Sequence, residues 1–147
     1  MKSLANEEID RNELINRLNS IPHSFFIKNN IEFMYLGGSW ASKTNNWWSD
    51  IDIFVSIPEF QNLESKQKLT ILMDMVEDIA QLTSMKNIQV NIFEIIPLHV
   101  QFQVIKDGIP IYERNISNRL IFIENLLNMY YDHQIWFSRM IDESLGV

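Results

Sequence analysis

The stretch from Leu36 to Val55 contains the residues whose types and spacing are best suited to chemistry. Gly38 and Ser39 are followed, after ten residues, by Asp50 and Asp52 in the pattern GS-x10-DxD. Two carboxylates this close repel each other unless a cation lies between them, and hard oxygen ligands of this kind suit Mg²⁺ or Mn²⁺. Because a nucleoside triphosphate supplies further oxygen ligands, the pattern predicts a metal-dependent phosphoryl-transfer site.

Two strands are predicted to position these groups. Residues 31–36 are rich in β-branched and aromatic side chains and end at two glycines, which predicts a strand that enters a tight turn. Ser39 is then placed to cap a short helix, whose first amides suit a phosphate. Residues 49–55 alternate, so Asp50 and Asp52 share one face of the second strand with Phe54, and the intervening aliphatic residues face the core.

A plainer interpretation is that Gly37 and Gly38 form an ordinary turn and that the two aspartates are solvated residues at the end of a strand. The strands on both sides of the spacer favour the functional interpretation, because they bring the glycines and the carboxylates to the same place.

With these motifs the chain resembles the minimal nucleotidyltransferases of the DNA polymerase beta superfamily, and among them the antitoxin half of bacterial HEPN/MNT toxin–antitoxin pairs. The residues that carry the resemblance are Gly38, Ser39, Ala41, Ser49, Asp50, Ile51 and Asp52. A second segment, residues 90–114, resembles the family's third core strand, a helix, and a strand that ends in Tyr-Glu-Arg. The resemblance extends over roughly residues 20–145, and its first motif is the specific one.

The resemblance implies a role for each residue of the motif. Gly38 and Ser39 would hold the triphosphate of ATP, and Asp50 and Asp52 would bind Mg²⁺ or Mn²⁺. Lys43 either reaches a phosphate or is simply solvated in the polar spacer. A third carboxylate normally completes the metal site and helps to deprotonate the acceptor, and the matching residue here is Asn91. Asparagine offers a carbonyl oxygen to a metal but has no charge and cannot act as a general base, so the departure concerns catalytic rate rather than nucleotide binding.

Glu94 is a candidate substitute for the missing carboxylate. Strand alternation argues against it, because Gln89 and Asn91 share one face of the predicted strand while Glu94 lies on the other. Only a β-bulge would bring Glu94 to the face of the aspartates.

The function that the resemblance implies is transfer of AMP from ATP to a hydroxyl, with a tyrosine of a cognate HEPN toxin as the acceptor and a hetero-oligomer of the two proteins as the complex. Two alternatives stay open. An antibiotic nucleotidyltransferase acting on an aminoglycoside or lincosamide hydroxyl would share the same motif, although such enzymes usually carry more helical structure. An antitoxin of low activity that neutralises its toxin by contact alone is compatible with Asn91.

Composition narrows the class of protein further. The 147 residues suit one domain, and the absence of cysteine excludes disulfides and thiolate metal sites. No apolar stretch approaches the roughly 18 residues of a membrane span, and the polar N-terminus lacks a signal-peptide core, so a cytoplasmic protein is expected. The formal net charge of −7 argues against direct binding of nucleic acid and suits a basic protein partner.

Hydrophobic periodicity predicts an α+β domain with a small mixed sheet flanked by helices, spanning residues 1–147. Helices are expected at residues 5–19, 60–84, 97–106 and 117–143, the last capped by Ser117 or Asn118, and the core at residues 31–114 includes a strand at 87–95. The last helix carries more apolar residues than one core-facing stripe usually holds, which indicates packing on two sides, a partner-binding surface, or both. Trp47 and Trp48 are expected to stack on a base, to face a partner, or to close the edge of the core.

Overall fold

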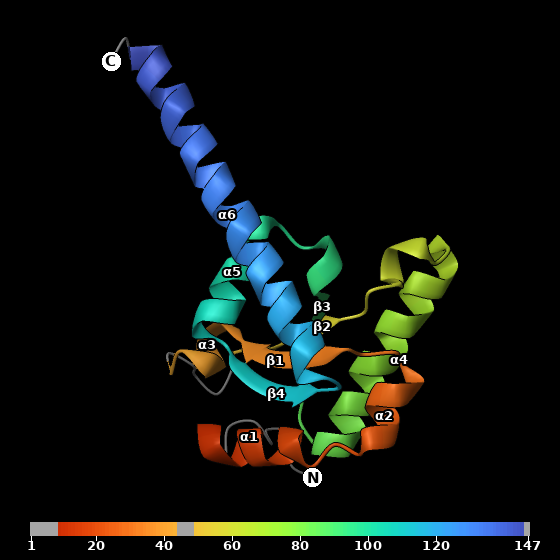
Figure 1. Cartoon of the computed structure of the whole chain (residues 1–147). Coiled ribbons are helices and arrows are strands. Elements are labelled where there is room, and N and C mark those ends of the chain that lie inside the picture. The colour runs from red at the N-terminus through yellow and green to blue at the C-terminus, as the bar shows by residue number, and fades with distance from the viewer. Residues whose placement is uncertain (1–8, 44–48, 146–147) are drawn as a thin grey trace.

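The computed structural model describes residues 9–43 and 49–145, and a four-stranded mixed sheet lies at its centre (Figure 1). The strands are β1 (Phe33–Gly37), β2 (Ile51–Ser56), β3 (Ile88–Ile92) and β4 (Ile109–Glu113). Their order is β3-β2-β1-β4; β1 runs antiparallel to both of its neighbours, and β2 runs parallel to β3. The predicted α+β fold with a small mixed sheet is confirmed.

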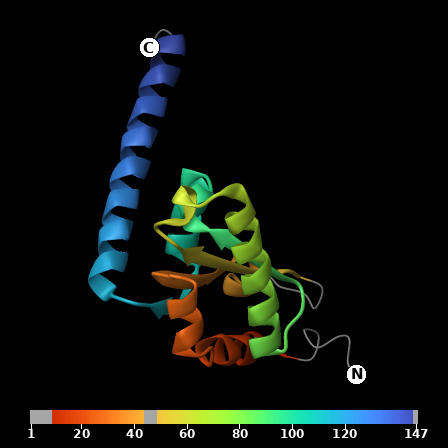
Figure 2. The same cartoon turned by 90° about the vertical axis from the view of Figure 1, so that its right-hand side faces the viewer.

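Helices cover both faces of this sheet (Figures 1 and 2). On one face lie α1 (Arg11–Asn19), α2 (His23–Lys28) and α4 (Ser65–Thr83). On the other lie α5 (Leu98–Asp107) and α6 (Ile116–Leu145). A single turn of helix, α3 (Gly38–Ala41), joins β1 to the segment before β2, and the short 3₁₀ turns η2 (Phe60–Asn62) and η3 (Phe93–Ile95) follow β2 and β3.

Alternation along β1 and β2 divides the buried residues into two cores. Ile51, Ile53 and Val55 belong to a mainly aliphatic core beneath α1, α2 and α4. Phe54 belongs to a smaller aromatic core with Phe93, beneath α5 and α6. The face that carries Phe54 is therefore covered rather than open, and it becomes accessible only where the strand approaches Asp52, which is half-buried.

The first turns of α6 are fixed to the sheet by polar contacts. Asn115 Oδ1 accepts hydrogen bonds from the backbone N–H groups of Ser117 (2.8 Å) and Asn118 (3.3 Å), so Asn115 is the cap of this helix, and the predicted caps lie inside it. Arg119 donates to Glu113 Oε1 (2.6 Å) and to the hydroxyl of Tyr35 (2.8 Å). From this anchor α6 continues well past the body of the domain (Figure 1).

Several predicted boundaries differ from the structure for local physical reasons. The predicted helix 5–19 is α1 from Arg11, with Asp10 Oδ1 accepting from Glu13 N at 2.8 Å, and residues 5–8 lie outside the described part. The predicted helix 60–84 is two elements, because the backbone is extended at Leu63 and Glu64 before α4 begins. The strand predicted at 87–95 ends at Ile92. Helix α2 was missed, because six residues are too few to show a helical period.

No helix in the described ranges, 9–43 and 49–145, is long and apolar enough to cross a membrane.

Candidate active site

The turn between β1 and α3 brings a glycine against a carboxylate. Gly38 has a positive φ of 64°, a conformation that L residues with side chains rarely adopt. A Cβ atom at this position would also overlap the carboxylate of Asp52. Gly38 is therefore required both by the backbone of the turn and by the close approach of Asp52.

Asp52 reaches this turn because of the register of β2. It pairs with Gly37 of β1 on one side and with Gln89 of β3 on the other. Asp50 lies one residue before β2, and its Oδ2 accepts a hydrogen bond of 2.9 Å from Nε2 of Gln89. The two aspartates and the glycine turn, which are separated in sequence by the spacer of residues 40–49, thus meet at one end of the sheet.

The surroundings of Asp52 disfavour its negative charge. Burial raises the pKa of the Asp52 carboxyl above its ordinary value, and the neighbouring charge of Asp50 raises it further. A cation between the two carboxylates would offset both effects, because opposite charge favours the ionised form. The donor set is made of hard oxygens and fits Mg²⁺ or Mn²⁺, provided that a substrate contributes further ligands. In the described ranges no group of three or more histidine, cysteine, aspartate or glutamate side chains is placed to hold a metal unaided.

Two amide side chains, rather than a third carboxylate, adjoin the aspartates. Residues directly paired on parallel strands share a face, so Gln89 lies beside Asp52 and Asn91 lies beside Phe54. Asn91 is on the predicted face, one pair further along β3 than the direct neighbour of Asp52 and therefore diagonal to Asp52. Alternation in the sequence predicts the face on which Gln89 lies, but not its direct pairing with Asp52, which only the register of the two strands shows.

Glu94 lies away from the aspartates. It belongs to η3, and its carboxylate accepts hydrogen bonds from the Ser56 hydroxyl (2.6 Å) and the backbone N–H of Ile57 (2.9 Å). Both donors are at the far end of β2 from Asp52. Glu94 therefore does not replace the missing carboxylate, but the reason differs from the predicted one: β3 ends at Ile92, so strand alternation does not extend to Glu94, which lies beside Ser56 at the other end of β2.

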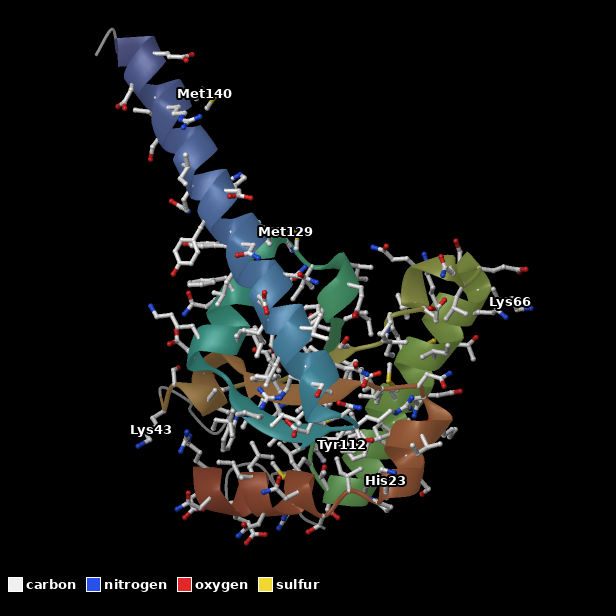
Figure 3. All side chains as sticks on the ribbon, viewed as in Figure 1. His23, Lys43, Lys66, Tyr112, Met129 and Met140 are labelled. Atoms are coloured by element: carbon white, nitrogen blue, oxygen red, sulfur yellow. The ribbon has the colours of Figure 1, made fainter. Side chains whose placement is uncertain are left out.

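The remaining predicted residues occupy different positions around α3. Ser39 is half-buried inside α3, and the N-cap of this helix is Gly37. The prediction that Ser39 caps the helix is therefore wrong. Lys43 follows α3 with a left-handed backbone (φ 64°), and Figure 3 shows its side chain pointing away from the body of the domain. Trp47 and Trp48 lie outside the described residues.

A cleft of about 210 Å³ adjoins the glycine turn. Its lining residues come from the turn and α3 on one side and from the end of α5 on the other: Gly37, Gly38, Ala41, Ser42, Gln103, Val104, Asp107 and Gly108. The side chain of Gln103 donates to that of Asp107. The sequence does not predict either residue as part of the site, because only the packing of α5 beside the glycine turn brings them to this cleft.

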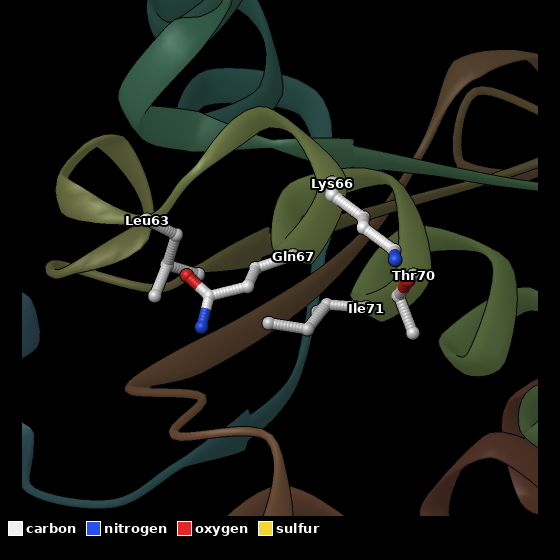
Figure 4. Close-up of a pocket in the computed structure, with 5 residues that line it drawn as sticks. All are labelled: Leu63, Lys66, Gln67, Thr70 and Ile71. Atoms are coloured by element: carbon white, nitrogen blue, oxygen red, sulfur yellow. The ribbon is translucent and has the colours of Figure 1, made fainter.

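A larger pocket, of about 360 Å³, lies elsewhere on the domain, at the start of α4 (Figure 4). It is lined by Leu63, Lys66, Gln67, Thr70 and Ile71. Figure 3 shows Lys66 on the opposite side of the molecule from Lys43, so this pocket is separate from the glycine turn. It contains no carboxylate and has no counterpart to the chemistry of Asp50 and Asp52.

A family model described as "Polymerase beta, Nucleotidyltransferase" matches residues 19–117, which include the glycine turn, both aspartates and all four strands. The chain belongs to this family. A comparison with curated protein sequences gave no significant match.

Solved structures of toxin–antitoxin complexes share the fold of this nucleotidyltransferase. One, a crystal structure of a toxin–antitoxin with AMP-PNP, matches with a TM-score of 0.61 at 20% identity, covering 93% of this chain and 99% of that one. Another, a tri-AMPylated Shewanella oneidensis HEPN toxin in complex with its MNT antitoxin, matches with a TM-score of 0.61 at 16% identity, covering 92% and 98%. A further Shewanella oneidensis structure matches with a TM-score of 0.60 at 14% identity, covering 87% and 96%.

Proposed function

We propose that this nucleotidyltransferase is the antitoxin of a HEPN toxin and that it transfers AMP from ATP, with Mg²⁺, to a tyrosine hydroxyl of that toxin. The observation that carries the proposal is the meeting of Asp50, Asp52 and Gly38 at one end of the sheet in a member of the polymerase beta nucleotidyltransferase family. We expect this antitoxin and its toxin to act in the cytoplasm.

The roles of the residues follow from their positions. Asp50 and Asp52 would hold Mg²⁺, or Mn²⁺ in its place, which neutralises phosphate charge when it is bound. Gly38 and Ser39 would border the triphosphate, since a side chain at position 38 would fill the space beside Asp52. The acceptor oxygen bonds to the α-phosphorus of ATP, the bond from that phosphorus to the bridging oxygen breaks, pyrophosphate leaves, and the hydroxyl proton passes to solvent. Lys43 would contribute only after its side chain turns toward the phosphates.

The choice of acceptor is supported by the structural neighbours and by charge. One neighbour is an antitoxin in complex with an AMPylated HEPN toxin, and its likeness to this chain extends over nearly the whole length of both chains. The net charge of −7 suits a basic partner. A tyrosine that gained AMP would carry a new negative charge and a bulky group, which together would disturb an RNA-binding surface.

A second candidate function, neutralisation by contact alone, is favoured by one observation. The two residues of β3 on the face of Asp52 are both amides, Gln89 and Asn91, and neither can act as a general base. Binding of the toxin would then persist with slow transfer of AMP or none.

The test uses the purified chain, the HEPN toxin encoded beside it, Mg²⁺ and ATP labelled at either the α- or the γ-phosphate. We expect α-label on a toxin tyrosine, no transfer of γ-label, and loss of labelling with the Asp50→Asn/Asp52→Asn variant. A complex that forms without labelling would support contact alone. A parallel incubation replaces the toxin with an aminoglycoside or a lincosamide. Label on the antibiotic, with none on the toxin, would overturn the antitoxin proposal in favour of antibiotic modification.

A further inference from the structure

Helix α6 carries an apolar seam that continues beyond the part of the helix that packs on the domain. Residues at alternating spacings of three and four share one side of a helix. From Ile123 these positions are occupied by Ile123, Leu126, Tyr130, His133, Phe137 and Met140. Ile141 lies beside Met140 on the same side.

The first half of this seam and its flank are packed against the domain. Leu126 is 1% exposed. The ring of Phe122, beside the seam, lies 5.1 Å from the ring of Phe33 of β1 and 5.6 Å from that of Phe93. Tyr130 stacks on Phe102 of α5, with ring centroids 3.9 Å apart. Helix α5 is thus the packing partner of α6 as far as Tyr130.

Beyond Tyr130 the helix projects from the domain (Figures 1 and 2). The distal half, residues 131–145, is about 22 Å long at 1.5 Å per residue. Every described side chain from Tyr131 to Glu143 is exposed, including Ile135 (53%) and Met140 (39%). Figure 3 shows Met140 on the part of α6 that lies far outside the body.

A solvated helix with this composition is unusual. Helical segments of about 12–15 residues are marginal in water without packing of an apolar face. Helices that are apolar on more than one side are normally covered, and clustered exposed apolar side chains mark interaction surfaces. The apolar seam therefore continues beyond Tyr130, where α5 no longer covers it. Another packing partner could cover this exposed part of the seam.

We propose that the distal half of α6 is a docking surface for a basic helical partner, which covers Met140 and Ile141 and extends the packing that α5 provides to the first half. The proposal rests on the proposed function, because the partner that it names is the HEPN toxin. It adds to that function the surface through which the toxin is held, which lies away from the glycine turn and Asp52.

The charge of the distal half favours a basic partner over a second copy of this chain. The distal half contains Asp132, Asp142 and Glu143 against the single cation Arg139. Two copies would bring together acidic helices of two chains that each carry a net charge of −7, which is unfavourable for association. A partner whose apolar face is flanked by lysine or arginine complements both the seam and its charges.

The test compares three full-length proteins: the parent, Met140→Glu/Ile141→Glu, and Ser138→Glu. Ser138 is exposed in the same half of the helix and is not one of the seam positions, so its variant shows what one of the two added charges does by itself. Binding to the purified toxin is measured by titration calorimetry, ATP binding is measured separately, and light scattering gives the oligomeric state of each chain alone. We expect the double variant to bind the toxin at least about tenfold more weakly, with parental binding by Ser138→Glu and unchanged ATP binding by all three.

Each other outcome overturns the proposal in a different way. If the double variant binds the toxin as tightly as the parent, the surface is wrong while the antitoxin function stands. If the parent does not bind the toxin, the proposed function fails and this inference fails with it. If the parent is a dimer and the double variant a monomer, the occupant of the seam is a second copy of this chain.

Discussion

Asp52 lies directly across the sheet from Gln89, because β2 and β3 are parallel and these two residues pair in register. The amide of Gln89 also donates to Asp50, at 2.9 Å, so this neutral side chain adjoins both aspartates. The residue that matches the third carboxylate of the family, Asn91, lies one pair further along, beside Phe54. Gln89 and Asn91 are therefore both candidates for the position of the third carboxylate.

A pair of substitutions separates these positions. Asn91→Asp is expected to raise AMP transfer by about 10²-fold, because it supplies the charged base that this face lacks. Gln89→Glu adds the same charge beside Asp52 and is expected to lower the Mg²⁺ concentration needed for half-maximal rate without a comparable gain in maximal rate. Initial rates measured across a Mg²⁺ series give both quantities. If Gln89→Glu instead raises the maximal rate and Asn91→Asp changes only the Mg²⁺ requirement, the third carboxylate position belongs to Gln89.

Neutral variants of the two aspartates should separate function from stability. Asp50→Asn and Asp52→Asn are each expected to abolish transfer, because each removes metal-ligand charge from the accessible end of the strand. Asp74→Asn, on the exposed surface of α4, makes the same charge change and should keep full activity. Full activity of either site variant at ordinary Mg²⁺ would show that the metal ligands lie elsewhere.

The raised pKa of Asp52 predicts that this residue destabilises the metal-free protein. Because its pKa is higher in the folded state, the folded protein binds more protons than the unfolded chain between the ordinary aspartate value of 3.8 and the raised value. Its contribution makes the metal-free protein less stable as pH rises through that window, and the full penalty persists at neutral pH. In EDTA at pH 7, Asp52→Asn should therefore have a higher Tm than the parent. An unchanged or lower Tm would contradict this account of Asp52.

The contact between Gly38 and Asp52 can be tested with alanine. Gly38→Ala is expected to cost about 1–3 kcal/mol of unfolding free energy, because of the positive φ, and to weaken Mg²⁺ binding, because the new Cβ displaces the Asp52 carboxylate. Gly37→Ala is the comparison: its Cβ would overlap the Phe54 ring, so it should lower stability with a smaller effect on Mg²⁺. Chemical denaturation and Mg²⁺ titration measure the two effects. Equal loss of Mg²⁺ affinity in both variants would mean that the Asp52 contact is not the cause.

Glu94→Gln tests the carboxylate that lies outside the site. Its hydrogen bonds to Ser56 and Ile57 join η3 to the end of β2, so their weakening should cost about 1–2 kcal/mol of unfolding free energy. Transfer under conditions in which the variant is folded should equal that of the parent. A large loss of activity without a loss of stability would return Glu94 to the list of catalytic candidates.

The sequence by itself determined the features that depend on neighbours along the chain. Alternation in residues 49–55 separated Ile51, Ile53 and Val55 from the face of Phe54, and the structure places these two sets in different cores. The glycines where β1 meets α3 and the long apolar helix at residues 116–145 were also visible as local patterns. Such features follow from the period of a strand or helix and from turn chemistry, which a single segment reveals.

The tertiary structure alone decided which segments meet. Pairing of Asp52 with Gln89 depends on the register of β3, which is set by packing of Ile88 and Ile92 in the aliphatic core and leaves no trace in either strand alone. Gln103 and Asp107 reach the glycine turn only because α5 packs beside β1. The extent of α5 also determines where the seam of α6 passes from buried to exposed, because α5 covers α6 only as far as Tyr130. An apolar stripe looks the same in sequence whether or not a partner covers it.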